Sequence, residues 1–385
     1  MPDPLAELRA AFPVAGRWIY FNHAAVAPLA EPVRAAMQEF EADASAHGSA
    51  HFEAWLQRRE RARSRAARLI GARPDDVAFT TSTSQGLALV AEGLDWRAGD
   101  EIVVVQDDFP ANQIPWFRQA RHGVKLVVVP RRDGRLPAAD ILSRVTPATR
   151  VVAVPSALYD NGFRLDLAAL GAGLADHKAW LVVDAIQTLG AFPLDAEALG
   201  IDALSADSHK WMLGLEGIGL FWCRPELRAR LDTPFISWMS LAEPFAPYRP
   251  DAALRPDARR YEWASLPTVG LFAVDACLEM LHRAGVEAIA ARILELTDRL
   301  ALGLERRGWR LASPRPPHAE APPAERSGIV TARPPSGEPV LEAGAAVAAL
   351  AERGVSVTPR GAGVRFSPHG WNTTDEVDAL LDRLP

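Results

Sequence analysis

Short apolar runs alternate with longer amphipathic segments between residues 77 and 223. The apolar runs are rich in Val, Ile and Leu and are nearly continuous, which is typical of strands covered on both faces. The segments between them, such as 85–93 and 167–177, have a helical character. This alternation predicts an α/β fold with a mainly parallel sheet and helices on both of its faces. The six predicted strands span residues 77–79, 102–105, 126–129, 151–154, 181–184 and 219–222.

The segments outside this alternation have other patterns. Residues 31–70 form a long helical stretch that is broken near His47. Residues 233–257 are rich in Pro and aromatic side chains and show no period, which favours an irregular connection. Residues 265–307 are largely helical, and residues 329–384 run as strand, helix, short strands and helix. We therefore expect the chain to end in a small α+β lobe.

Composition narrows the class of protein. The chain has 385 residues, 49% of them hydrophobic, which suits one subunit with two lobes. A net charge of −6 gives no reason to expect nucleic acid or an anionic membrane as a partner. Residues 1–10 lack the basic and apolar regions of a signal peptide, and no apolar run could span a bilayer. Cys223 and Cys277 have no metal or disulfide spacing, so we expect a reducing, cytoplasmic setting. No His, Asp or Glu spacing suggests a metal site, so we expect no bound metal.

Lysine is rare in this chain, and one lysine has an unusual context. The 42 basic residues include only Lys125, Lys178 and Lys210. Lys125 and Lys178 fit exposed positions near a turn and a helix end, whereas Lys210 is followed by apolar Trp211 and Met212. A desolvated lysine has a lowered pKa and becomes a nucleophile, which can form a Schiff base with a carbonyl cofactor.

Three further segments carry polar or aromatic residues where predicted strands end. Asp184 ends a buried strand and could pair with a protonated pyridine nitrogen, or could simply cap a helix. The hydroxyl-rich turn at residues 80–84 could bind a phosphate at a helix N-terminus, or serve only as a cap. Phe109 follows another strand and could stack on a planar cofactor or belong to the core.

These segments, in this order, resemble the class V aminotransferase branch of the fold-type I enzymes that use pyridoxal 5′-phosphate (PLP). That branch includes cysteine desulfurases, selenocysteine lyases, kynureninases and isopenicillin N epimerase-like proteins. The matching segments are residues 20–25, 83–84, 109–112, 184–187, 208–211 and 364–373. The resemblance implies a large PLP-binding domain with a seven-stranded type of sheet at residues 20–265. It also implies a small domain made of residues 1–19 and 266–385, and a homodimer whose sites are shared between subunits.

The resemblance also implies a role for individual residues. Lys210 matches the Schiff-base lysine and moves protons as base and acid, and Asp184 matches the partner of the pyridine nitrogen. Arg365 matches the arginine that holds the substrate carboxylate, while His23 and Ala24 are expected to line the substrate entrance. The remaining expected cofactor contacts are Phe109 at the ring face, Gln187 and Tyr159 near the ring hydroxyl, Thr83, Ser84, Ser208 and His209 at the phosphate, and Ser265 at the phosphate of the neighbouring subunit.

The reaction is less defined than the cofactor. We expect an enzyme that acts on an amino acid through a carbanion at Cα, with transamination as the first expectation and C–S or β-elimination or epimerisation as alternatives. Relatives that form a persulfide carry a cysteine in the loop before the carboxylate arginine, and residues 358–363 contain none. A non-catalytic PLP-binding regulator is a further alternative, although no DNA-binding module is appended. No Gly-x-Gly-x-x-Gly follows the first strand, which argues against a dinucleotide-dependent oxidoreductase.

One helix break leaves two interpretations open. His47 and His51 resemble a segment that approaches the active site of the partner subunit in relatives. The alternative, which the local pattern favours, is that they are two exposed histidines at a helix break.

Overall fold

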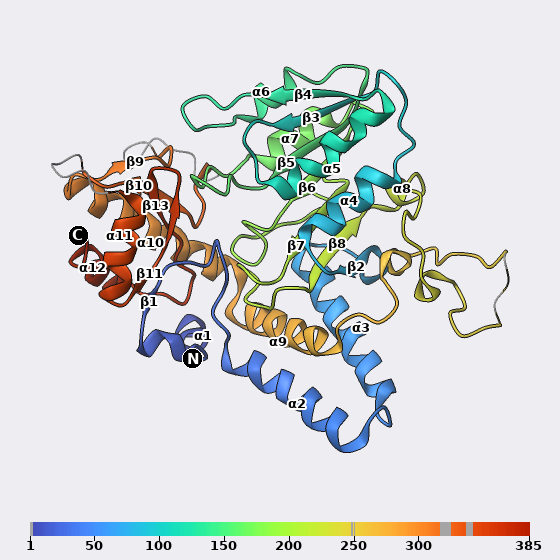
Figure 1. Cartoon of the computed structure of the whole chain (residues 1–385), viewed down its shortest axis with the longest axis horizontal. Coiled ribbons are helices and arrows are strands. Elements are labelled where there is room, and N and C mark those ends of the chain that lie inside the picture. Colours follow the sequence, from blue (N-terminus) through green and yellow to red (C-terminus); the bar gives the residue numbers. More distant parts are fainter. Residues whose placement is uncertain (1–2, 248, 250, 316–324, 336–341) are drawn as a thin grey trace.

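A seven-stranded sheet forms the centre of the molecule (Figure 1). The computed structural model describes residues 3–247, 249, 251–315, 325–335 and 342–385. Five neighbouring strands, β7, β6, β5, β3 and β4, run parallel, whereas β8 is antiparallel to β7 and β2. The mainly parallel α/β sheet predicted from the sequence is therefore confirmed. In sheet order the strands are β2 (Val77–Thr80), β8 (Gly219–Cys223), β7 (Ala203–Asp207), β6 (Trp180–Asp184), β5 (Thr149–Pro155), β3 (Glu101–Val105) and β4 (Lys125–Val129).

Both faces of this sheet are buried, which explains the continuous apolar strands. Alternate residues of one strand point into different cores: Val103 and Val105 of β3 lie in one cluster, Ile102 and Val104 in the other. Helix α4 (Thr83–Gly93) packs against β7, and a Cβ added to Gly86 would lie 2.3 Å from Ser205 Oγ. The other helices around the parallel strands are α5 (Ile114–Phe117), α6 (Ala138–Leu142), α7 (Leu167–Leu174) and α8 (Pro225–Arg228).

Three long helices form a layer below the sheet in Figure 1. Helices α2 (Glu31–His47) and α3 (Phe52–Leu69) both pack on α9 (Thr268–Ala284). The break that the sequence predicts near His47 is present, because Gly48 follows α2 with a φ of 59°, a conformation that favours glycine. Short 3₁₀ helices lie at Pro13–Gly16, Pro74–Asp76, Pro110–Asn112, Arg118–His122, Trp238–Ser240 and Ala258–Tyr261.

A second, smaller sheet lies in the C-terminal part, on the left in Figure 1. Its four antiparallel strands are β12 (Thr358–Arg360), β13 (Gly363–Phe366), β10 (Val330–Arg333) and β9 (Arg310–Leu311). Helix α10 (Val286–Arg306) packs against β9 and β10, α11 (Ala343–Glu352) packs against β12 and β13, and α12 (Thr374–Leu381) packs on α10. The N-terminal segment joins this part, since β1 (Ile19–Tyr20) pairs in parallel with β11 (Val355–Ser356) after helix α1 (Pro4–Ala10).

The segment 233–257 is irregular, as its pattern predicts. Its described residues contain the 3₁₀ turn Trp238–Ser240 and an isolated antiparallel bridge between Leu241 and Leu254. Several large apolar side chains in and near it are exposed, namely Phe235, Ile236, Trp238, Phe245 and Trp263. Among the helices of the described residues, none has the length and apolarity needed to cross a membrane.

Candidate active site

The residues expected to carry chemistry gather at one edge of the central sheet. Asp184 is the last residue of β6, and Lys210 follows the end of β7. Phe109 follows β3, and Thr83 opens α4 directly after β2. These positions lie at the carboxyl ends of parallel strands and the start of a helix, where open α/β sheets bind ligands.

Lys210 is buried and has no partner for its amine. Only 8% of the residue is exposed, and its Nζ lies 5.6 Å from the centre of the Phe109 ring. Within the described part of the chain Nζ makes no hydrogen bond or ion pair. Burial, together with the positive charges of Arg365 and Arg360, lowers the pKa of Lys210 to about 8, against the opposing effect of Asp184. A neutral amine is therefore accessible near physiological pH.

Asp184 is a buried carboxylate, and only one of its oxygens has a hydrogen-bond partner within the described residues. Its Oδ1 accepts a hydrogen bond from the backbone N–H of Ile186 at 3.0 Å. Burial raises the pKa of Asp184 to about 6, against the opposing effects of that N–H and of Lys210. The carboxylate thus retains capacity for a cationic partner, in addition to the capping interaction that the sequence allowed.

Asp108 is a second buried carboxyl that sequence reasoning missed. Its oxygens accept hydrogen bonds from Phe109 N at 2.7 Å and from Asn112 Nδ2 at 2.9 Å. Burial raises the pKa of Asp108 to about 7, and the negative charge of Asp184 adds to the effect. Asp108 therefore fixes the backbone that carries Phe109. The available signal was the acidic pair before Phe109 at the end of a strand.

The residues of the hydroxyl-rich turn have different roles: one caps helix α4, and another connects this helix to strand β7. Ser82 is the N-cap of α4, because its hydroxyl accepts from Gln85 N. Thr83 is buried and its Oγ1 accepts from Asp207 N at 2.9 Å, which joins the start of α4 to the end of β7. Ser84 is exposed. The first N–H groups of the helix have no intrahelical partner, so this turn can bind an anion.

Two of the expected phosphate contacts point in different directions. His209 Nδ1 lies 3.1 Å from Asp207 Oδ1 at the site edge. Ser208 is fully buried and its hydroxyl donates to the carbonyl of Leu215 at 2.8 Å. The Ser208 side chain also packs under Gly214, where an added Cβ would lie 2.5 Å from its Oγ. The Ser208 hydroxyl thus stabilises the turn after Lys210, which differs from the expectation that it faces the phosphate.

His23 and Ala24 lie in the interior and do not line an entrance, which corrects the sequence expectation. Both are fully buried, and His23 Nδ1 lies 3.1 Å from the carbonyl oxygen of Ser367. The His23 ring contacts the rings of Trp211, His369 and Trp371, and burial lowers the pKa of His23 well below its usual value. The reason is long-range packing: residues 22–24 pair with Ser367 beyond β13.

The side-chain amide of Gln187 forms hydrogen bonds with other residues of this chain. Its Nε2 donates to the carbonyl of Ala24 at 3.3 Å, and its Oε1 accepts from Trp211 Nε1 at 3.0 Å. The amide therefore ties the segment after β6 to the residue that follows Lys210. A contact between Gln187 and the ring hydroxyl of a cofactor stays a prediction.

Arg365 brings a guanidinium from the small sheet to this site. It is fully buried, and its Nη1 donates to the carbonyl of Tyr159 at 2.7 Å. Its Nε and Nη2 have no hydrogen-bond partner among the described residues. Burial and the charge of Arg360 lower the pKa of Arg365 to about 9. Two unpaired donors on one planar group suit a carboxylate, which accepts both at once.

Tyr159, Ser265 and the two cysteines complete the set of predicted positions. Tyr159 packs edge-on against Phe109, with ring centres 5.3 Å apart. Ser265 is exposed on this chain. Cys223 and Cys277 are fully buried, and burial raises the pKa of each thiol to about 12. Neither cysteine is therefore a reactive thiolate.

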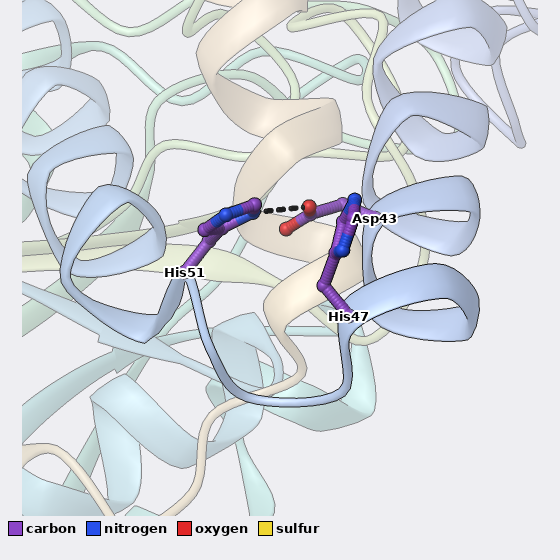
Figure 2. Close-up of side chains that lie close together, drawn as sticks. All are labelled: Asp43, His47 and His51. Carbon is purple, nitrogen blue, oxygen red and sulfur yellow. Dashed lines mark hydrogen bonds and ion pairs between the residues drawn. The ribbon is translucent and has the colours of Figure 1, made fainter.

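One group of potential metal ligands lies away from this site, although the residue spacing in the sequence suggested no metal site. Asp43, His47 and His51 at the turn between α2 and α3 offer ligand atoms within 4.8 Å of one another (Figure 2). His51 Nδ1 lies 2.6 Å from Asp43 Oδ1, and Trp55 Nε1 donates to Asp43 Oδ2 at 2.7 Å. Both oxygens of the Asp43 carboxylate thus have partners within the chain. These contacts connect α2 to the start of α3, which accounts for the arrangement without a metal.

The main site fits PLP by the chemistry of its donors. A buried amine without a partner suits an aldehyde, and a buried carboxylate suits a pyridine nitrogen. The first turn of α4 suits a phosphate. Arg365, whose charge acts on Lys210, has donors for a carboxylate that are unpaired within the described residues.

Comparison with known proteins agrees with this fit. The sequence model of the family described as aminotransferase class-V matches residues 19–380. A protein of Bacillus subtilis (strain 168), named uncharacterized aminotransferase YcbU, is 28% identical over 92% of this chain and 90% of its own length. A cysteine desulfurase of Klebsiella pneumoniae subsp. pneumoniae is 31% identical over 75% of each chain.

The fold agrees with a solved structure over almost all of its length. The apo cysteine desulfurase from Thermococcus onnurineus NA1 superposes with a TM-score of 0.89 and 25% identity, covering 99% of this chain and 97% of that one. These matches confirm the fold and the PLP cofactor that the sequence motifs predict. Because the family match spans nearly the whole sequence, this chain belongs to the aminotransferase class-V family.

Proposed function

We propose that the protein is a PLP-dependent lyase that removes a sulfur leaving group from Cβ of an amino acid by β-elimination. The observation that carries this proposal is Lys210, a buried amine without a partner whose pKa is lowered to about 8. Such an amine can accept and return a proton near neutral pH. The relation to a cysteine desulfurase that is 31% identical supports a substrate with sulfur at Cβ.

The residues that would hold the cofactor follow from the site. Lys210 would bind it covalently through Nζ, Asp184 would pair with the pyridine nitrogen, and Phe109 and Tyr159 would form the wall beside the ring. Thr83, Ser84 and His209 would contact the phosphate, and Ser265 would reach the phosphate in the partner subunit. When bound, PLP supplies an electron sink that stabilises negative charge at the substrate Cα.

The chain itself supplies binding and proton transfer. Arg365 would hold the α-carboxylate through Nε and Nη2, since Nη1 is already bound to Tyr159. Lys210 Nζ, as a neutral amine, would take the proton from Cα and return it to the departing sulfur. The Cα–H and Cβ–S bonds break, and a double bond forms between Cα and Cβ.

A persulfide route does not fit the thiols of this chain. That route needs a thiolate that reaches the substrate sulfur. The segment 358–363 contains no cysteine, and burial raises the pKa of Cys223 and Cys277 to about 12. Elimination needs only the base and the cofactor, which is why we prefer it to desulfuration through a persulfide.

Transamination, the first expectation from the sequence, is the second candidate. The relative named as an aminotransferase matches 92% of the chain, which favours it. Lys210 could move a proton from Cα to the cofactor carbon instead of to a leaving group. The relatives named as cysteine desulfurases support a lyase reaction more directly than they support transamination.

Product analysis separates these candidates. The holoenzyme is incubated with cysteine or cystine, with and without a 2-oxo acid. Elimination predicts 2-oxo acid and ammonia from the substrate without any acceptor. Transamination predicts a new amino acid that appears only with the acceptor, and this result would replace our proposal. Lys210→Ala should abolish the reaction, whereas Lys178→Ala, a change at an exposed lysine, should leave it intact.

We also propose that the protein is a homodimer. The exposed apolar side chains of the 233–257 segment, such as Phe235 and Phe245, form a surface that a second copy could cover. Sedimentation equilibrium tests this: twice the chain mass is expected, and a monomer at all concentrations would refute it.

A further inference from the structure

Arg360 lies beside Arg365 on one face of the small sheet. Strand β12 pairs with β13 so that Thr358 faces Arg365 and Arg360 faces Gly363. Side chains of paired residues share a face, and so do residues two apart in a strand. Arg360 is therefore the diagonal neighbour of Arg365, at a typical separation of about 7–8 Å for such pairs.

This face is directed at the loop that borders the active site. Thr331, opposite Arg365 on β10, donates through Oγ1 to the carbonyl of Asp160, and Arg365 donates to that of Tyr159. The Arg360 guanidinium lies 6.0 Å from the centre of the Tyr159 ring. The charge of Arg360 also lowers the pKa of Lys210. Arg360 thus belongs to the surroundings of the reactive amine.

The two arginines lack a carboxylate partner. Within the described residues neither forms an ion pair, and the Nε of each is buried without a hydrogen bond. The nearby Asp160 accepts two hydrogen bonds from Arg131 Nη1, at 2.9 and 2.7 Å, and so is already paired. Two neighbouring cations in a partly desolvated site repel one another until an anion binds.

We propose that Arg360 binds a second anionic group on the substrate, so that the enzyme acts on amino acids whose side chain bears a carboxylate or another oxyanion. This inference rests on the proposed function, in which Arg365 holds the α-carboxylate. Each guanidinium then pairs with its own anion. A tight turn at Gly361 and Ala362 joins β12 to β13, which holds Arg360 in place relative to Arg365.

Binding of unreactive carboxylates tests the inference without any turnover. Succinate and butyrate have the same carbon chain, and only succinate has a second carboxylate. Calorimetric titration of the holoenzyme should show succinate binding at least about tenfold more tightly, the effect of one additional charge-assisted contact. Arg360→Gln should abolish that difference and leave butyrate unchanged, and Arg360→Lys should restore part of it.

The controls separate the possible failures. Arg333→Gln changes an exposed arginine of the same sheet and should bind both ligands as the parent protein does. Equal binding of succinate and butyrate by the parent protein would overturn the inference. An equal loss of both ligands in Arg360→Gln would also overturn it, because both arginines would then hold one carboxylate. Selective succinate binding together with a failed elimination assay would instead reject only the proposed reaction.

Discussion

Arg365 donates a hydrogen bond from Nη1 to the backbone carbonyl of Tyr159, 2.7 Å away. This bond joins the small sheet to the loop after β5, at the edge of the central sheet where Lys210 lies. It also orients the guanidinium, and in the part of the chain that the structure describes, Nε and Nη2 are left without partners. The guanidinium proposed to bind the substrate carboxylate is also electrostatically coupled to the amine proposed to react, because the charge of Arg365 lowers the pKa of Lys210.

This coupling predicts the pH dependence of cofactor loading. The pKa of Lys210 is lowered to about 8, so the neutral amine that attacks an aldehyde increases as pH rises through this value. The rate at which the cofactor-free protein acquires the absorbance of bound PLP should rise with a midpoint near pH 8. Arg365→Gln removes a neighbouring cation and should move the midpoint upward.

Exposed Arg333 provides the matched control, and Arg333→Gln should leave the loading midpoint unchanged. A loading midpoint in the usual pKa range of lysine would show that burial does not lower the pKa of Lys210. A midpoint that is unchanged in Arg365→Gln would show that Arg365 does not affect this pKa.

Replacing Asp184 should separate cofactor binding from rate. Asp184→Asn keeps the shape of the side chain and its contact with Ile186 N, but removes the charge that would pair with the pyridine nitrogen. We expect PLP to bind and turnover to fall by about 10²-fold or more, as for other charge-assisted contacts in active sites. Steady-state rates and cofactor absorbance measure the two effects.

Asp202 is a suitable control for this substitution. It is also a buried carboxylate, and it accepts a hydrogen bond from Leu181 N at the opposite end of β6. Asp202→Asn should keep the rate. Near-normal turnover of Asp184→Asn would mean that Asp184 acts only as a cap.

The cysteines should be dispensable for chemistry. Because burial raises the pKa of both thiols to about 12, they remain protonated at neutral pH and cannot attack a substrate sulfur. The double variant Cys223→Ala, Cys277→Ala should retain its elimination rate, and neither protein should carry a persulfide after incubation with cysteine. Mass spectrometry after alkylation detects such a species. A persulfide present in the parent protein and absent from the variant would disprove this expectation.

Local patterns predicted much of the fold. Apolar runs located six strands of the central sheet, and the helical stretch 31–70 breaks at His47 as expected. The strand that was missed is β7 (Ala203–Asp207), which lies inside the sheet between β8 and β6. Its sequence contains Ser205 and Asp207, and such polar residues hide the apolar signature of a buried strand. Ser205 fits there because Gly86 of α4 approaches it closely.

The sequence predicted those features of the site that depend on local sequence patterns, and missed those that depend on long-range contacts. Strand ends identified Asp184 and Phe109, and apolar flanks identified Lys210. The burial of His23 and the direction of Ser208 depend on contacts with Ser367 and Leu215, which no local pattern encodes. Arg360 was overlooked for the same reason, since its position beside Arg365 follows from the register of two short strands.

The proposed chemistry depends most directly on which amine binds the cofactor. Lys125 and Lys178 are exposed, and Lys210 is the buried lysine. Reduction of the holoenzyme with borohydride fixes the cofactor to its amine, and peptide mapping then locates the pyridoxyl group. We expect the label on Lys210 alone, and a label on Lys125, on Lys178 or on no lysine would contradict this assignment.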